Sequence, residues 1–139
     1  MRALIVGAGG IARDLVRRLG ERWEITVVDS VPERLERMES VRPVSTYLGD
    51  GSSRIVLNRA GLESADALIA AGDDDEANLE ACRLAEAASI TRIVAVCNES
   101  ERQEEYRRLG FQVVIPDTLS ARRVEQRLES RRLASMAFA

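Results

Sequence analysis

Short apolar runs alternate with segments of helical periodicity along the whole of this 139-residue chain, and this alternation constrains the fold most. A strand, a helix and a second strand in succession build a parallel sheet, because the helix crosses over the sheet before the chain returns. Such crossovers are right-handed and place helices on both faces in a doubly wound arrangement. We therefore expect an α/β fold with a mainly parallel sheet of about six strands.

The expected strands are short and rich in Val, Ile, Leu and Ala. They lie at residues 2–6, 24–29, 43–50, 65–71, 91–98 and 111–116. The expected helices carry apolar residues at helical spacing, and several end at a glycine. They lie at residues 11–19, 30–38, 52–62, 73–88, 100–110 and 118–139. At the start of the second helix, Ser30 and Glu33 have the spacing of a capping box.

The composition removes several kinds of chemistry. The chain has no histidine, and all of its basic residues are arginines. Without histidine there is no His-based triad, and without lysine there is neither a Schiff base nor the lysine of a P-loop. Cys82 and Cys97 lack CxxC spacing, so we expect no metal site and interpret both as buried small apolar residues.

Other features of the sequence concern location and partners. No run of about 18 apolar residues is present, which predicts no membrane span. The N-terminus enters a strand-like run directly, without the longer apolar region and cleavage site of a signal peptide, so we expect a cytoplasmic protein. The net charge of −3 disfavours a nucleic-acid partner, because nucleic-acid-binding surfaces are usually basic.

A glycine-rich turn joins the first expected strand to the first expected helix. Residues 7–12 read Gly-Ala-Gly-Gly-Ile-Ala and fit the pattern GxGxxG/A in the context that gives it meaning. Gly7 allows a tight turn, Gly9 lets a pyrophosphate approach the backbone, and the small Ala12 lets the helix pack closely on the strand. The phosphates are then expected on the free N–H groups at the start of the helix.

Asp29 ends the second expected strand, 20 residues after Gly9. An acid at this place in a Rossmann-like fold accepts hydrogen bonds from ribose hydroxyls. A carboxylate also repels a 2′-phosphate, which favours NAD or an adenosine nucleotide over NADP. The alternative is a helix cap for residues 31–38, but the glycines in register favour the ribose role. We therefore assign residues 1–117 to a Rossmann-like nucleotide-binding domain.

Two further polar clusters follow expected strands. Residues 49–52 follow the third strand, and residues 72–75 follow the fourth. Ligands bind at this edge of an open α/β sheet. Asp50 has two open interpretations, an acceptor for an adenine amino group or part of a turn. Gly72 would let a nucleotide lie against the backbone, whereas for Asp73 to Asp75 helix capping is favoured over ligand contact.

Together these motifs resemble the regulator-of-potassium-conductance domains, also called TrkA N-terminal or KTN domains. The most specific stretch is GDGSSRIVLNRAGLESADALIAAGDDDEANLEACRLA, with further likeness in IVGAGGIARDLVRRL and VVDSVPERLERM. The resemblance implies phosphates on the glycine turn, ribose on Asp29, adenine near Asp50 and Gly51, and Asn78 near the site. The expected nucleotide-contacting residues are Gly7, Ala8, Gly9, Gly10, Ile11, Asp29, Ser30, Asp50, Gly51, Ala71, Gly72, Asp73 and Asn78.

The resemblance also implies a function. Such domains bind NAD(H), ATP, ADP or related nucleotides as effectors, control potassium channels or transporters, and are not generally enzymes. ATP-binding relatives often carry arginine where this chain has Gly10 and Val96. These departures favour NAD(H), AMP or ADP over ATP, and Arg13 is either a compensating cation or a solvated helix residue.

Partners and alternatives complete the expectations. An apolar stripe on the helix at residues 118–139 predicts a homodimer contact, and the resemblance implies a membrane potassium channel or transporter subunit as partner, reached from the cytoplasm. Two alternatives are the nucleotide-binding module of a larger enzyme, such as a phosphoesterase fusion, and a fragment of an NAD-dependent oxidoreductase. For the latter, Tyr47 and Tyr106 are the remaining candidate acids.

Overall fold

The computed structural model describes residues 1–116, 121 and 123–130, and within them it shows a six-stranded sheet in the order β3-β2-β1-β4-β5-β6. Every strand pairing in this sheet is parallel. The strands are β1 (Arg2–Val6), β2 (Glu24–Asp29), β3 (Ser45–Leu48), β4 (Ala67–Ala70), β5 (Arg92–Val96) and β6 (Gln112–Val114). The predicted doubly wound α/β fold is therefore confirmed.

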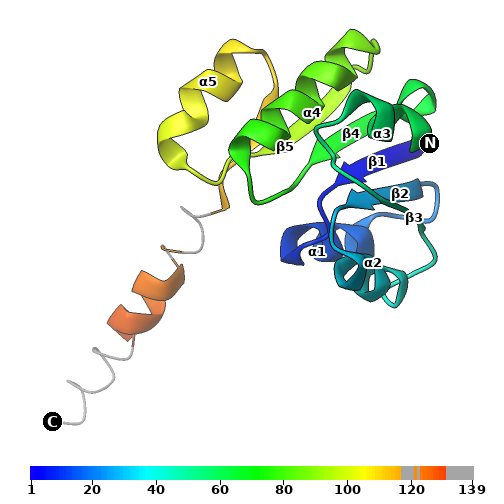
Figure 1. Cartoon of the computed structure of the whole chain (residues 1–139). Helices are drawn as coiled ribbons and strands as arrows, with labels where there is room; N and C mark the ends of the chain where they lie inside the picture. Colours follow the sequence, from blue (N-terminus) through cyan, green and yellow to red (C-terminus); the bar gives the residue numbers. More distant parts are fainter. Residues whose placement is uncertain (117–120, 122, 131–139) are drawn as a thin grey trace, which may run out of the picture.

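Helices cover both faces of the sheet (Figure 1). One face carries α1 (Gly10–Arg18) and α2 (Pro32–Glu39), and the other carries α3 (Arg54–Arg59), α4 (Asp75–Ala87) and α5 (Gln103–Arg108). Two short 3-10 helices, η1 (Leu62–Ser64) and η2 (Ser100–Arg102), follow α3 and precede α5. The strand order switches direction between β1 and β4, and right-handed crossovers therefore place α1 and α4 on opposite faces. Open α/β sheets bind ligands at such a switch point.

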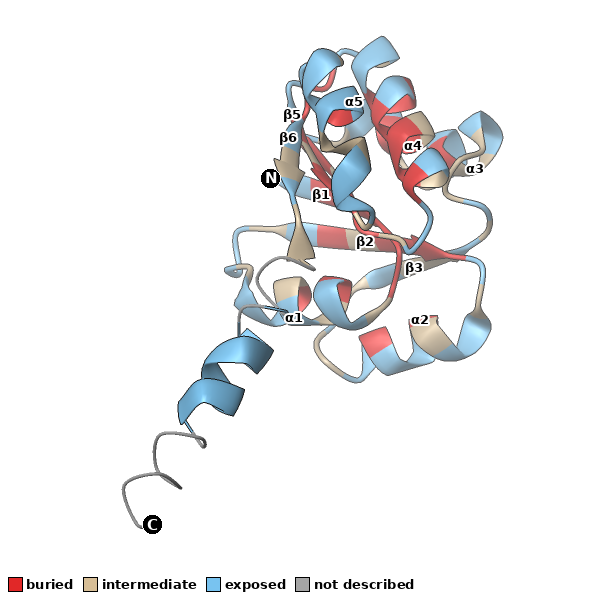
Figure 2. Cartoon of the chain, turned by 90° about the vertical axis from the view of Figure 1, so that its left-hand side faces the viewer, coloured by how far each residue is buried: buried red, intermediate tan, exposed pale blue. Residues whose placement is uncertain are grey.

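Two apolar clusters hold these layers together, and Figure 2 shows the buried residues gathered on the sheet and on the inner sides of the helices. The larger cluster contains Leu4, Leu68 and Leu79 between the sheet and α3 to α5. The smaller one contains Ile5 and Val16 between the sheet and α1 with α2. The central strands are thus buried on both faces, which explains their nearly continuous apolar sequence.

The elements differ from the predictions mainly at their ends. β1 and β2 have the expected bounds, and α1 is shifted by one residue from its expected range. The other strands and helices are shorter than expected, and the expected helix at 52–62 is α3 followed by the separate turn η1. The predicted capping box of Ser30 and Glu33 is wrong. The N-cap of α2 is Val31, no side chain caps it, and the carboxylate of Asp29 accepts the N–H of Val31 instead.

The C-terminal helix is described only in part. Residues 121 and 123–130 are helical, and Val124 and Leu128 are exposed on this segment, which projects away from the sheet (Figure 1). The remainder of the helix predicted at 118–139 lies outside the described residues. In the part of the chain that the structure describes, every helix is too short or too polar to cross a bilayer.

Candidate functional site

The glycine turn after β1 has the conformation that its sequence requires. Gly7 has φ of +104°, and a Cβ at this position would lie 2.8 Å from backbone atoms of Ala71 and Gly72. The turn therefore packs directly against the chain leaving β4. By contrast, a Cβ at Gly9 would meet no heavy atom within 4 Å, so the backbone here faces open space. Gly9 is also the N-cap of α1 and offers no side-chain cap.

Asp29 lies at the end of β2 and is buried, with 8% of its surface exposed. Its Oδ1 accepts a hydrogen bond from the N–H of Ala8 at 3.0 Å, and its Oδ2 accepts from the N–H of Val31 at 2.9 Å. The carboxylate thus joins the glycine turn to the start of α2. Since an ionised carboxylate offers about four acceptor positions, two remain for other donors such as ribose hydroxyls.

The chain leaving β4 is held by two asparagines. The side chain of Asn78 is fully buried and clamps Gly72, because its Oδ1 accepts from the Gly72 N–H at 2.9 Å while its Nδ2 donates to the Gly72 carbonyl at 2.9 Å. The same Nδ2 also donates to the Val96 carbonyl. Asn98 adds a second donor to the Gly72 carbonyl at 2.9 Å. Asn78 therefore positions the loop through its side chain.

The three consecutive acids after Gly72 have different roles. Asp74 caps α4, because its Oδ1 accepts the N–H groups of Glu76 and Ala77, which confirms the capping prediction for this residue. Asp75 is buried and accepts hydrogen bonds from the N–H groups of Asn98 and Glu99. Asp73 is 83% exposed at its side chain and lies 3.6 Å from the guanidinium of Arg34.

A buried network surrounds Asp75. The Tyr106 hydroxyl donates to Asp75 Oδ1 at 2.8 Å, and Asn98 Nδ2 lies 3.2 Å from the same oxygen. Burial alone would raise the pKa of Asp75, but the hydrogen bonds from Asn98, Glu99 and Tyr106 outweigh it and hold the pKa below its usual value. Burial and the hydrogen bond to Asp75 raise the pKa of Tyr106.

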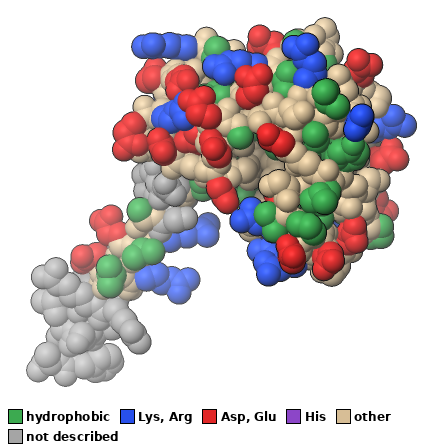
Figure 3. Space-filling model, in the orientation of Figure 1, with side chains coloured by type: hydrophobic (Ala, Val, Ile, Leu, Met, Phe, Trp, Pro, Cys, Tyr) green, Lys and Arg blue, Asp and Glu red, His purple; other side chains and the backbone are tan. Residues whose placement is uncertain are grey.

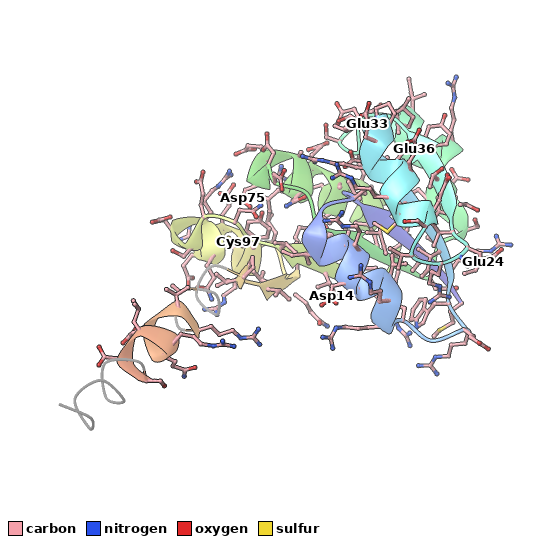
Figure 4. The ribbon with its side chains drawn as sticks, turned by 90° about the horizontal axis from the view of Figure 1, so that it is seen from below. Asp14, Glu24, Glu33, Glu36, Asp75 and Cys97 are labelled. Carbon is pink, nitrogen blue, oxygen red and sulfur yellow. The ribbon has the colours of Figure 1, made fainter. Side chains whose placement is uncertain are left out.

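Cys97 lies next to this network, and Figure 4 shows it close to Asp75 between α4 and α5. Its Sγ donates to the Glu99 carbonyl at 2.9 Å. Burial raises the pKa of the Cys97 thiol, and it raises that of Cys82 to about 12. Both cysteines are fully buried, as predicted.

The turn after β3 is tightly built. Asp50 Oδ1 accepts from both the N–H and the hydroxyl of Ser52, and these hydrogen bonds lower the pKa of Asp50. A Cβ at Gly51 would lie 2.1 Å from the Val6 side chain. Close packing on β1 therefore requires a glycine at position 51. The turn interpretation of Asp50 is confirmed, while contact with adenine stays a prediction.

Arg34 was not among the predicted site residues. It lies in the first turn of α2, and its Nη1 is 4.0 Å from Asp29 Oδ1. Its position five residues after Asp29 is the sequence signal that would have found it, since the first turn of this helix follows the acid at the end of β2. Arg13 also lies near the site, with its guanidinium 4.0 Å from the position of a Cβ on Gly10.

The charges around this edge of the sheet are unevenly distributed. Figure 3 shows acidic side chains gathered over α5 and the start of α4, and basic side chains next to α1. The exposed acids in the first turns of the two helices are Glu76, Glu104 and Glu105. The structure brings Gly7 to Ile11, Asp29, Ser30, Ala71, Gly72 and Asp73 to one edge. Gly51 adjoins them through Val6.

The strand order, the glycine turn and the acid at the end of β2 define a Rossmann-type α/β domain. More specifically, the model of the TrkA-N domain matches residues 3–117, and the chain belongs to this family. The family resemblance drawn from the sequence is thereby confirmed.

Among curated relatives, the chain is 41% identical over 86 residues to the Trk system potassium uptake protein TrkA of Halomonas elongata. The matched segment covers 61% of this chain and 19% of that protein. It is 25% identical over 138 residues to the TrkA homolog of Methanothermobacter thermautotrophicus, covering 98% of this chain and 64% of that protein. The chain therefore spans less than two thirds of the length of these relatives.

Solved structures show the same fold. The GsuK channel bound to NAD is 28% identical with a TM-score of 0.69, covering 81% of this chain and 21% of the channel chain. The TrkA-N domain of the inner membrane protein ybaL from Escherichia coli is 25% identical with a TM-score of 0.75, covering 91% and 96%. The NAD(P)-binding domain of an exopolyphosphatase-related protein from Archaeoglobus fulgidus shares the fold at 20% identity, with a TM-score of 0.71 and coverage of 92% and 97%.

Proposed function

We propose that this chain is a regulatory domain that binds NAD(H) or a related adenine nucleotide and thereby controls a potassium transport protein. The observation that carries the proposal is the geometry of the glycine turn, which is open at Gly9 and tied to the Asp29 carboxylate through Ala8. Membership of the TrkA-N family and the names of the TrkA relatives support the potassium transport system as the context.

The site residues fit a nucleotide with one or two phosphates. The first N–H groups of α1 would bind the phosphates, because Gly9 provides no side-chain cap and leaves space for an anion. The free acceptor positions of Asp29 would bind the ribose hydroxyls. GsuK, at 28% identity, has been solved with NAD and with ADP, which supports these ligands here.

Arginines at the site are fewer than a triphosphate would call for. Gly10 and Val96 stand where ATP-binding relatives often carry arginine, and Val96 is buried and apolar. Arg13 lies beside Gly10 and provides one cation near the start of α1. We therefore favour NAD(H), AMP or ADP over ATP.

The domain would act by a population shift. A nucleotide that binds one arrangement of the domain and its partner more tightly than another moves the equilibrium toward that arrangement. We propose a homodimer in the cytoplasm, with a membrane potassium channel or transporter subunit as partner. The exposed Val124 and Leu128 on the C-terminal helix support an apolar contact between copies.

The domain would not itself be an enzyme. Of the two candidate acids for an oxidoreductase, Tyr106 is fully buried, donates to Asp75 and has a raised pKa, so it is unsuited to proton transfer in the crevice. Tyr47 lies half-buried on β3. These observations favour binding without turnover.

Thermal unfolding with NAD+, NADH, NADPH, AMP, ADP and ATP tests the proposal. A ligand of the folded state raises the melting temperature in a concentration-dependent way. We expect saturable stabilisation by NAD+, NADH, AMP or ADP, and smaller effects of ATP and NADPH. In a separate absorbance assay for turnover of the cofactor, we expect no change at the nicotinamide band. If none of the six nucleotides stabilises the chain at millimolar concentration, the nucleotide-binding function is rejected.

A further inference from the structure

Arg34 lies between two carboxylates, one at the end of β2 and one in the loop after β4. Its Nη1 is 4.0 Å from Asp29 Oδ1, at the end of β2, and 3.6 Å from Asp73 Oδ2, in the loop after β4. Because β1 lies between β2 and β4 in the sheet, a link from α2 to this loop passes beside the glycine turn that leaves β1. The guanidinium therefore lies beside the glycine turn, on the side of Ala8.

The Arg34–Asp73 pair is accessible, whereas the neighbouring acids are committed to the fold. The side chains of Arg34 and Asp73 are 41% and 83% exposed. Asp74 caps α4, and Asp75 is tied to Asn98, Glu99 and Tyr106. An exposed ion pair of this kind is weak, so a stronger anion can replace its carboxylate.

The Asp29 oxygen nearest to Arg34 is the one that accepts from Ala8, within the glycine turn. Arg34 is thus placed toward the turn, where a 5′-phosphate would lie, while Asp29 Oδ2 is held by Val31. A guanidinium binds phosphate with paired, charge-assisted hydrogen bonds, which an exposed carboxylate at 3.6 Å does not match.

We propose that Arg34 is a phosphate-binding residue of the nucleotide site, and that Asp73 is an internal competitor that holds its guanidinium when no nucleotide is bound. This inference rests on the proposed nucleotide-binding function and extends it. A 5′-phosphate takes the place of the Asp73 carboxylate on Arg34. The exchange releases the loop between β4 and α4 from α2, so that nucleotides, but not nucleosides, alter the link between the two sides of the crevice.

Isothermal titration of the chain with adenosine, AMP and NAD+ tests this assignment. The variants are Arg34→Gln, Arg34→Lys, Asp73→Asn and the double variant R34Q/D73N. Arg37→Gln, exposed on the same helix, is the matched control for losing an arginine, and Glu36→Gln is the control for losing an acid. Thermal unfolding of each variant confirms that it is folded.

We expect R34Q to lower the affinity for AMP and NAD+ by about tenfold or more, because the phosphate contact is lost. The affinity for adenosine, which has no phosphate, should change by less than about twofold. R34K should recover part of the loss, since it keeps the charge without the planar fork. Asp73→Asn should raise the affinity for AMP by about threefold. In the double variant the Asp73→Asn change should give no such increase over R34Q, because the two residues act on one another. Both controls should bind like the unchanged chain.

Different failures have different meanings. If the unchanged chain binds neither AMP nor NAD+, the proposed function itself fails. If it binds AMP and R34Q binds AMP equally well, nucleotide binding stands and the role of Arg34 is overturned. If Asp73→Asn lowers the affinity for AMP, Asp73 contributes to ligand binding and its role as a competitor is overturned.

Discussion

The Tyr106 hydroxyl donates a 2.8 Å hydrogen bond to Oδ1 of Asp75, which joins α5 to the first residue of α4. The same carboxylate accepts the N–H groups of Asn98 and Glu99, just after β5. Three segments that are distant in sequence therefore meet at one buried acid, next to the loop that carries Gly72. This carboxylate therefore fixes the start of α4 to α5 and to the segment after β5.

Replacing Tyr106 by Phe should lower stability with little change in packing. The variant loses the hydrogen bond to Asp75, which we expect to cost about 1–2 kcal/mol of unfolding free energy, or about 3–7 °C in melting temperature. Chemical and thermal unfolding measure the loss. Tyr47→Phe, the same change at a half-buried position on β3, is the control and should differ by less than about 0.5 kcal/mol. Equal losses in both variants would contradict the special role of Tyr106.

The depressed pKa of Asp75 predicts loss of stability in acid. Its contribution is fully present above the pKa of an aspartate in the unfolded chain, about 3.9, and disappears as the pH falls through the lower pKa of the folded state. We therefore expect the unfolding free energy to decrease from about pH 5 downward, and Asp75→Asn to flatten that slope.

The control for this measurement is Asp50→Asn. The pKa of Asp50 is also lowered, by its hydrogen bonds from Ser52, but the residue is exposed and solvent screens its interactions. Urea unfolding at several pH values should show a smaller change of slope for this variant. A slope in Asp75→Asn identical to that of the unchanged chain would refute the assignment.

Two glycine-to-alanine changes should separate folding from binding. Gly7→Ala places a Cβ against the backbone of Ala71 at positive φ and should destabilise the fold by about 3 kcal/mol or more. Gly9→Ala has room for its methyl group and ordinary φ, so stability should change by less than about 1 kcal/mol. Its methyl group would nevertheless occupy the space for the phosphate and lower the affinity for AMP by about tenfold. Unaltered AMP binding by folded Gly9→Ala would argue against this phosphate position.

Asn78→Ala should loosen the loop after β4. The change removes hydrogen bonds to both backbone groups of Gly72 and to the Val96 carbonyl, at a cost of about 2–4 kcal/mol. Hydrogen exchange should show faster opening of the Gly72 amide. Asn58→Ala, at an exposed position on α3, serves as the control and should leave that amide unchanged.

The sequence predicted the α/β fold because alternation of strands and helices depends on local pattern alone. Gly7, Gly9 and Asp29 could be placed together because a parallel sheet brings the ends of its strands to one edge. Asn98 and Tyr106 could not be assigned to Asp75 in this way, since their meeting depends on how α4 and α5 pack. The capping box at Ser30 and Glu33 failed because α2 begins one residue later than expected, with Val31 as its N-cap, and the Asp29 carboxylate, two residues earlier in the chain, accepts the N–H of Val31.

The two backbone hydrogen bonds to Asp29 bear on the cost of ligand binding. A loop that becomes ordered only when its ligand arrives loses conformational entropy at that moment, and affinity falls accordingly. Here the turn at Ala8 and the first residues before α2 are already fixed by one carboxylate. The domain thus receives its ligand on a backbone that is already preorganised at these two points, and the loop after β4 is left as the segment that can respond.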